Sequence, residues 1–517
     1  MSLAKILWVD DEIDMLRPHI MFLEGKDYEV ETANNGSDAL EMIQDTNFDL
    51  VFLDENMPGL TGLEVLEEIK KISSVLPVIM ITKSEEEHIM EEAIGSNIAD
   101  YLIKPVNPNQ ILLAIKKNID SKKIISEKNA HGYQMEFRNI GMEISNRLDF
   151  DEWIDIYKRL VEWELKLEGS DDQGILEIFQ MQKDEANSVF ASFIERNYVD
   201  WVNGVEEAPI QSQTLIRNKV LPKLVKGTPT FLFVIDNLRY DQWRSIYPLI
   251  SDYFHLDSDE IYYSILPTTT QYARNSLFAG LMPSEIAKKY PQYWIDEHEE
   301  GTKNQFEAEL LETQLKRLGK DYKTSYNKIL TLSKGRKLAD NMHQLMNNDL
   351  NVIVYNFVDM LSHARTEMEV IRELASDEKA YRSLTNSWFN NSPLFDMLRF
   401  IAEKGGNVVI TTDHGSVRVK KPVKIVGDRN TNTNLRYKFG RNLDYKKKEV
   451  FEVRNPDDIF LPKINVSTSY VFSKEADFFA YPNNYNYYAN YYRDTFQHGG
   501  ISMEEVLIPI VSLSAKK

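Results

Sequence analysis

Six acidic and histidine side chains in the second half of the chain have the residue types and the places that metal chemistry requires. They are Asp236, Asp359, His363, Asp413, His414 and His498. Most of them follow an apolar run, such as FLFVID or NVVITTDH. Histidine and carboxylate ligands without any cysteine favour zinc, with manganese and magnesium as competitors. Six ligands are too many for one tetrahedral ion, so this set predicts two metal ions.

A threonine-rich stretch, ILPTTTQYARNS, supplies hydroxyl groups that suit the same chemistry. Two metal ions about 3.5–4 Å apart hold the attacking and leaving oxygens of an in-line displacement. A threonine hydroxyl is a weak nucleophile at neutral pH unless a metal ion lowers its pKa. The residues alone leave Thr268, Thr269 and Thr270 as candidates for the nucleophile.

A second acidic cluster is expected within the first 120 residues. Asp10 and Asp11 end KILWVDD, Asp54 ends FDLVFLD, Thr82 ends LPVIMIT and Lys104 ends ADYLIK. Carboxylates that meet at one point repel each other unless a divalent cation lies among them, and oxygen ligands favour magnesium. Thr82 and Lys104 would then contact an added phosphoryl group. A single polar residue at a strand end is usually an ordinary structural residue, such as a helix cap. The predicted site therefore depends on all five residues lying at matching strand ends.

The elements that position both clusters are apolar strands that alternate with helical stretches. This alternation predicts doubly wound α/β sheets, whose ligands gather at the carboxyl ends of the strands. Between the two α/β regions, residues 121–208 read as a helical bundle or linker. Trp153, Ile156, Leu160 and Trp163 recur there at helical spacing, and a core stripe is favoured over a ligand site. For the segment YPNNYNYYANYY, a polar surface loop is favoured over a base-stacking surface.

Composition narrows the function classes. The chain has 517 residues, no cysteine and a net charge of −20, which excludes disulfides and thiol ligands and disfavours duplex DNA as a partner. We see no apolar run long enough to span a membrane and no signal peptide at the N-terminus, so we expect a cytoplasmic protein without a membrane span.

The first 120 residues closely resemble the flavodoxin-like receiver domain of two-component response regulators. The resemblance carries over residue by residue and implies a sensor histidine kinase as partner. Asp54 would accept the phosphoryl group, and Asp10 and Asp11 would hold magnesium together with it. The switch residues would be Thr82, Tyr101 and Lys104.

Residues 209–517 form the third predicted domain, and most of it resembles the PglZ domain of the alkaline phosphatase superfamily. The order of Asp236, PTTT, DMLSH, DHG and HGG carries the resemblance. In the phosphodiesterase branch the nucleophile closes a Pro-Thr-x-Thr run, which implies Thr270. One zinc would be held by Asp236, Thr270, Asp413 and His414, and the other by Asp359, His363 and His498. A sulfatase is disfavoured because its cysteine or serine is absent from this place.

Across its length the chain resembles the PorX-type regulators of bacterial type IX secretion. That resemblance implies a zinc-dependent phosphodiesterase that cleaves cyclic and linear oligonucleotides, with a sigma factor as a further partner. The helical segment and the receiver also predict a homodimer on phosphorylation. One alternative is a metal-stabilised interaction platform without turnover. The other is a DNA-binding output, which the acidic charge and the absence of a helix-turn-helix pattern disfavour.

Substrate contacts are predicted in a basic stretch between Arg418 and Arg454. It holds twelve Lys and Arg against four Asp and Glu, and it follows the DHG ligand motif. Arg429, Arg436 and Tyr437 are candidates for gripping phosphate and stacking a base, although such a run is also typical of a solvated face. Arg274, one helical turn after Thr270, is a further candidate, with a structural ion pair as its alternative.

Overall fold

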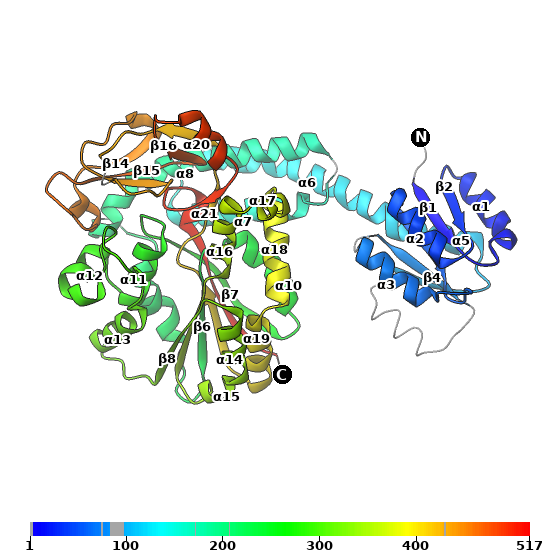
Figure 1. Ribbon diagram of the computed structural model, residues 1–517, viewed down its shortest axis with the longest axis horizontal. Helices are drawn as coiled ribbons and strands as arrows, with labels where there is room; N and C mark the ends of the chain where they lie inside the picture. The colour runs from blue at the N-terminus through cyan, green and yellow to red at the C-terminus, as the bar shows by residue number, and fades with distance from the viewer. Residues whose placement is uncertain are drawn as a thin grey trace. The chain divides into compact units, whose positions relative to one another are not determined.

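A computed structural model of the chain describes residues 4–73, 76–82, 98–170, 172–205, 207–428 and 431–516. The described residues divide into two compact units, formed mainly by residues 1–134 and 135–517 (Figure 1). None of the described helices is both long enough and apolar enough to cross a lipid bilayer.

The first unit is built on a parallel five-stranded sheet in the order β2-β1-β3-β4-β5. The strands are β1 (Lys5–Val9), β2 (Glu29–Ala33), β3 (Leu50–Asp54), β4 (Val78–Thr82) and β5 (Asp100–Ile103). Side chains alternate across a strand, so Leu7 and Val9 of β1 face one core and Ile6 and Trp8 face another. Every residue of β3 and β4 is buried, as expected for central strands of a parallel sheet.

Helices cover both faces of this sheet and confirm the doubly wound fold. The described ones are α1 (Arg17–Glu24), α2 (Gly36–Asp45), α3 (Gly62–Ile72) and α5 (Pro108–Ile115). α2 and α3 pack in the core that contains Leu7, while α1 and α5 pack in the core that contains Trp8. The helical stretch expected between the strands that end at Thr82 and Lys104 lies outside the described residues.

Three long helices follow: α6 (Ser121–Ile144), α7 (Phe150–Leu167) and α8 (Gln173–Asn203). Asp149 caps α7 in a reciprocal capping box with Glu152, which explains its sharp start. Trp153 on α7 is buried and packs edge-on against Phe190 on α8, with ring centroids 5.3 Å apart. The predicted apolar stripe therefore forms core, except that Trp163 is only partly buried.

The main sheet of the second unit has six strands in the order β7-β18-β10-β6-β9-β8. They are β6 (Thr230–Ile235), β7 (Phe254–Tyr263), β8 (Thr324–Ile329), β9 (Leu350–Tyr355), β10 (Asn407–Thr411) and β18 (Leu507–Ala515). β8, β9, β6 and β10 run parallel, and β18 is antiparallel to both of its neighbours. The carboxyl ends of β9, β6 and β10 therefore lie side by side at one edge of the sheet.

Smaller sheets and many helices complete this unit. The small sheets pair β11 (Val417–Arg418) with β17 (Phe496–Gln497), β12 (Lys421–Lys424) with β16 (Asp477–Ala480), and β13 (Tyr437–Gly440) with β15 (Ser469–Ser473) and β14 (Val450–Val453). The helices are α9 (Ser212–Leu215), α10 (Tyr240–Ile250), α11 (Thr270–Ala279), α12 (Pro283–Lys289), α13 (Glu307–Arg317), α14 (Leu332–Asp340), α15 (Met342–Leu345), α16 (Phe357–Glu367), α17 (Glu369–Leu374), α18 (Glu378–Asn390), α19 (Pro393–Lys404), α20 (Tyr485–Tyr492) and α21 (Met503–Val506).

The tyrosine- and asparagine-rich segment was expected to be a polar loop, and that expectation is wrong. Most of it forms helix α20, in which Ala489 is buried. Because residues i and i+4 of a helix share a face, the helical backbone gives its tyrosines a regular arrangement that a loop would lack.

Candidate active site

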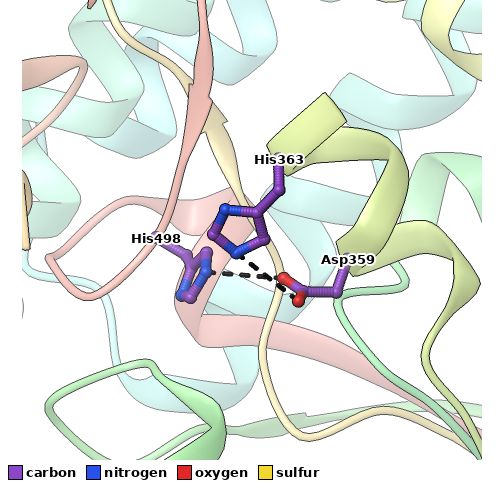
Figure 2. A group of neighbouring side chains, drawn as sticks. All are labelled: Asp359, His363 and His498. Atoms are coloured by element: carbon purple, nitrogen blue, oxygen red, sulfur yellow. Dashed lines mark ion pairs between the residues drawn. The ribbon is translucent and has the colours of Figure 1, made fainter. Parts of the chain in front are cut away.

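The edge of the main sheet brings the predicted ligands together. Asp236 follows β6, and Asp413 and His414 follow the adjacent strand β10. Asp359 and His363 lie on α16, which follows β9, and their spacing of four residues places them on one helix face. His498 follows β17 and reaches the same place from the C-terminal part of the chain (Figure 2).

The six side chains form two groups of three. One ligand atom each from Asp236, Asp413 and His414 lie within 4.8 Å of one another, and those three side chains are buried. Asp359, His363 and His498 form a second group within the same distance. Each group has the mixture of carboxylate and imidazole that zinc prefers.

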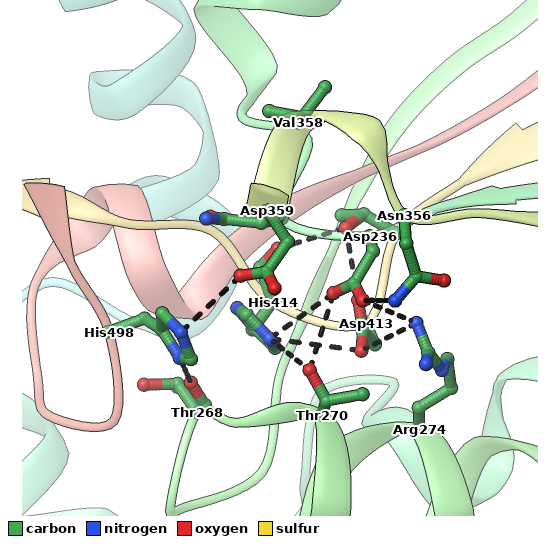
Figure 3. A network of polar contacts seen from close by, with 12 residues as sticks. Asp236, Thr268, Thr270, Arg274, Asn356, Val358, Asp359, Asp413, His414 and His498 are labelled. Carbon is green, nitrogen blue, oxygen red and sulfur yellow. Dashed lines mark hydrogen bonds and ion pairs between the residues drawn. The ribbon is translucent and has the colours of Figure 1, made fainter. Parts of the chain in front are cut away.

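Thr270 is the threonine that faces the first group. Its Oγ1 lies 3.3 Å from Asp236 Oδ1 and 3.1 Å from His414 Nε2 (Figure 3). The Thr268 hydroxyl instead donates to the Gly500 carbonyl at 3.0 Å and accepts the Gly499 N–H at 3.0 Å. The Thr269 hydroxyl finds no hydrogen-bond partner among the described residues. The three consecutive threonines therefore have different surroundings, and Thr270 begins helix α11 beside the ligands.

Two histidines are oriented by backbone carbonyl groups. His414 Nδ1 lies 3.1 Å from the Gly415 carbonyl, and His498 Nδ1 lies 3.2 Å from the Thr268 carbonyl. A carbonyl oxygen only accepts, so each Nδ1 must carry the hydrogen. The lone pair of each neutral ring is thereby left on Nε2, which points toward the carboxylates. Such outer hydrogen bonds are typical of metal-binding histidines.

Asp236 is fixed by two side chains behind it. Asn356 Nδ2 donates to Asp236 Oδ2 at 2.8 Å, and Arg274 Nη1 lies 2.7 Å from the same oxygen. Oδ1 is thus left for Thr270 and His414. The Arg274 side chain is fully buried and its Nε also contacts Glu307 at 2.5 Å. The prediction that Arg274 contacts substrate is therefore wrong: it is a structural ion pair on the inward face of α11.

The buried carboxylates of the site are only partly neutralised by the side chains around them. Burial, followed by the charge of Asp236, raises the pKa of both Asp359 and Asp413 to about 6. Burial alone would also raise the pKa of Asp236, but Arg274 and His414 lower it. Asp359 Oδ1 and Asp413 Oδ2 accept no hydrogen bond from the described residues. Buried carboxylate oxygens without donors fit a site for divalent cations.

We expect Asp413→Asn to stabilise the metal-free protein at neutral pH. A carboxyl whose pKa is about 6 when folded loses its stabilising contribution as the pH rises from about 3.9 through 6, whereas asparagine stays neutral. The free energy of unfolding of the variant in chelator should exceed that of the parent by about 1–3 kcal/mol at pH 7. Denaturant titration should show this difference vanishing near pH 4; a variant less stable than the parent at pH 7 would contradict the assignment.

The loop that carries His498 is held in place by a second buried arginine. Gly500 N–H donates to Glu505 Oε1 at 2.9 Å, and Arg436 Nη2 lies 2.6 Å from Glu505 Oε2. A Cβ on Gly500 would lie 2.9 Å from the Arg436 guanidinium, so glycine is needed for this approach. Arg436 is fully buried, and the prediction that it grips phosphate is wrong. Arg429 lies outside the described residues.

A cavity of about 710 Å³ opens beside the two groups of ligands. Tyr437 lines it and donates its hydroxyl to Glu297 at 2.8 Å; that it stacks a base stays a prediction. Sequence reasoning did not consider these other residues of its wall: Gln271, Glu297, Lys303, Asn304, Asn356, Thr366 and Gln497. Of these, Asn356 could have been found from the sequence, because it ends the apolar run NVIVYN as the other strand-end candidates do. Tyr491 and Tyr492 also line the cavity, and they belong to the segment for which a base-stacking surface was the disfavoured alternative.

The first unit holds the predicted second acidic cluster. Carboxylate oxygens of Asp10, Asp11 and Asp54 lie within 4.8 Å of one another, a donor set that fits magnesium. Lys104 Nζ lies 2.7 Å from Asp10 and 3.1 Å from Asp54. Burial raises the pKa of Asp54, and Lys104 opposes this shift. Thr82 is buried at the end of β4, and Tyr101 lies in the adjacent strand β5.

Comparison with protein families divides the chain into three parts. Residues 6–116 match the response regulator receiver domain, residues 123–202 match the PorX response regulator linker domain, and residues 215–513 match the BREX system PglZ alkaline phosphatase-like domain. The last match covers more than half of the chain.

Individual relatives match the receiver part. The chain is 37% identical over 113 residues to the transcriptional regulatory protein ResD of Bacillus subtilis, which covers 22% of this chain and 47% of ResD. It is 39% identical over 116 residues to a CpxR homolog of Haemophilus influenzae, covering 22% and 49%. The chain thus spans about half the length of these relatives. A receiver domain structure from Clostridium thermocellum is 35% identical, covering 24% of this chain and 98% of that one, with a TM-score of 0.23.

Proposed function

Since the chain belongs to the PglZ alkaline phosphatase-like family and has the receiver and linker domains of PorX-type response regulators, we propose that its output domain is a two-zinc phosphodiesterase. The observation that carries this proposal is the pair of three-residue ligand groups beside Thr270, at the wall of the cavity. Asp236, Thr270, Asp413 and His414 would hold one ion, and Asp359, His363 and His498 the other.

Thr270 would be the nucleophile. Zinc bound at these residues would lower the pKa of the threonine hydroxyl and neutralise charge on the phosphoryl oxygens. The hydroxyl lies 3.3 Å from Asp236 Oδ1 and 3.1 Å from His414 Nε2, and either acceptor would be placed to take its proton. Attack of Oγ1 on phosphorus would form the threonine phosphoester as the bond to the leaving oxygen breaks, and the leaving group would depart as an alcohol that carries the proton removed from Thr270. Water then hydrolyses this ester and restores the hydroxyl.

The cavity wall favours diesters over monoesters. Among the described residues that line it, Lys303 alone carries a permanent positive charge. Its ammonium group already donates to the carbonyls of Asp296 and Glu299. Arg274 and Arg436 are buried in ion pairs and do not line the cavity. A phosphodiester carries one negative charge and needs less compensation than the dianion of a monoester.

The test is hydrolysis by the zinc-loaded protein. We expect kcat/KM for bis(4-nitrophenyl) phosphate to exceed that for 4-nitrophenyl phosphate by at least about tenfold, because the wall offers little charge for a dianion. Chelation should abolish both activities and added zinc should restore them. A preference for the monoester would contradict the proposed substrate class. No hydrolysis of either ester would favour the metal-stabilised interaction platform.

The receiver would control this activity. Asp54 would take a phosphoryl group from a sensor histidine kinase, with Asp10 and Asp11 holding magnesium and with Thr82, Tyr101 and Lys104 as switch residues. We propose that phosphorylation favours a homodimer. Oligonucleotide substrates, a sigma-factor partner and a role in type IX secretion are further parts of the proposal that rest on the resemblance to PorX-type regulators.

A further inference from the structure

Helix α20 presents a ladder of tyrosine rings that begins in the wall of the active-site cavity. Tyr491 and Tyr492 line the cavity. Tyr487 stacks on Tyr491 with ring centroids 6.0 Å apart and planes 14° apart, and Tyr488 stacks on Tyr492 at 6.1 Å and 13°. Tyr487 is 64% exposed and Tyr488 is 40% exposed. The rings therefore lead from the cavity to the protein surface.

Polar contacts hold the inner part of this ladder in place. The Tyr491 hydroxyl donates to the Thr366 carbonyl at 3.2 Å, and Thr366 itself lines the cavity. The Tyr485 hydroxyl donates to the Pro422 carbonyl at 3.0 Å at the start of the helix. Two contacts thus fix α20 on the second unit, while Tyr487 and Tyr488 keep large exposed ring surfaces. Such surfaces cost free energy in water unless a ligand covers them.

Positive charge lies beside the ladder in a protein that is acidic overall. The Arg372 guanidinium is 5.3 Å from the centre of the Tyr491 ring and donates to the Thr366 carbonyl at 2.7 Å. Its Nε is buried and has no hydrogen-bond partner among the described residues. At the other end of the helix, Lys424 Nζ is 4.9 Å from the centre of the Tyr485 ring. Stacked rings beside cations are the features that bind unpaired bases and backbone phosphates.

We propose that Tyr487, Tyr488, Tyr491 and Tyr492 form a base-stacking track that guides single-stranded nucleic acid to the metal centre. The inference rests on the proposed phosphodiesterase function and specifies its substrate as a strand longer than the cavity alone holds. Bases in a duplex are already stacked and paired, so only a single strand offers free faces to the rings.

The experiment compares two substrates in three double variants of the full chain. Tyr487→Ala with Tyr488→Ala removes the outer rings, Tyr487→Phe with Tyr488→Phe keeps them, and Asn486→Ala with Asn490→Ala changes exposed non-aromatic positions of the same helix. The readout is the ratio of kcat/KM for a single-stranded oligonucleotide of about ten nucleotides to that for bis(4-nitrophenyl) phosphate.

We expect this ratio to fall about 10- to 100-fold in the alanine variant, through a higher KM, and to stay near the parent value in the other two. An unchanged ratio in the alanine variant, or an equal fall in the phenylalanine variant, would overturn the track. If the parent cleaves neither substrate, the phosphodiesterase proposal fails. In that case, binding of the labelled oligonucleotide, measured by fluorescence anisotropy, tests the track without any need for activity. The track then requires that the alanine variant binds the oligonucleotide more weakly than the parent and that the other two variants do not.

Discussion

Replacing Thr270 by valine is expected to lower kcat for bis(4-nitrophenyl) phosphate by at least about 1000-fold. Valine has nearly the shape of threonine but no hydroxyl group, so helix α11 and the ligand groups should keep their positions. Of the three adjacent threonines, Thr270 has its hydroxyl beside Asp236 and His414. Steady-state hydrolysis at saturating substrate measures the effect.

Thr270→Ser is the matched control because it keeps the hydroxyl and loses only a methyl group. We expect it to retain activity within about tenfold of the parent. Metal content should be measured for both variants, since six other ligands remain. Hydrolysis by Thr270→Val at the parent rate, with metal bound, would mean that another group attacks phosphorus.

Replacing Lys183 by methionine is expected to destabilise the second unit by about 3–5 kcal/mol, because it leaves buried carboxylates without their partner. Lys183 lies on α8, and its Nζ is 2.8 Å from Glu164 on α7 and 3.1 Å from Glu504 on α21. Despite burial, these carboxylates raise the pKa of Lys183 above its ordinary value. Denaturant unfolding followed by a signal from the second unit measures the loss.

Lys166→Met is the control for this change. Lys166 also pairs with a glutamate on α7, Glu162, at 2.7 Å, but both side chains are about half exposed. A surface pair of this kind contributes less than about 1 kcal/mol. Equal effects of the two substitutions would show that the buried network adds no more stability than a surface pair.

Buried ion pairs also join the linker helices α7 and α8 to residues close to the active site. Arg382 Nη1 contacts both Glu164 and Asp241 at 2.7 Å. Glu164, Asp241 and Glu378 form a further acidic group, but Arg239 and Arg382 neutralise it, so it does not resemble a metal site. Glu504 is followed by Glu505, which binds the His-Gly-Gly loop. The linker therefore packs against a residue adjacent to the support of His498.

The convergence of the candidate ligands could be predicted because residues at strand ends have a known position in a parallel sheet. Asp236, Asp413 and Asp10 each follow an apolar strand, and parallel strands deliver such residues to one edge. The apolar stripe around Trp153 could also be predicted, because helical periodicity shows which face of a helix is buried.

Residues that act across the fold could not be predicted in this way. Arg436 pairs with Glu505, 69 residues away, and its local basic surroundings indicated a surface role instead. For Arg274 the sequence left a substrate contact and a structural ion pair open, since its partner Glu307 lies on a different helix and could not be identified. Asparagine and tyrosine have only modest helix propensity, so the local sequence does not indicate the helix that Tyr485–Tyr492 form.

The metal content of the purified full-length protein tests the central claim most directly. Elemental analysis after removal of loosely bound ions should find two zinc ions per chain. Asp359→Asn combined with His363→Ala should reduce this number to one, because these residues belong to one ligand group. A folded parent protein that hydrolyses the diester and contains no transition metal would contradict the two-zinc account.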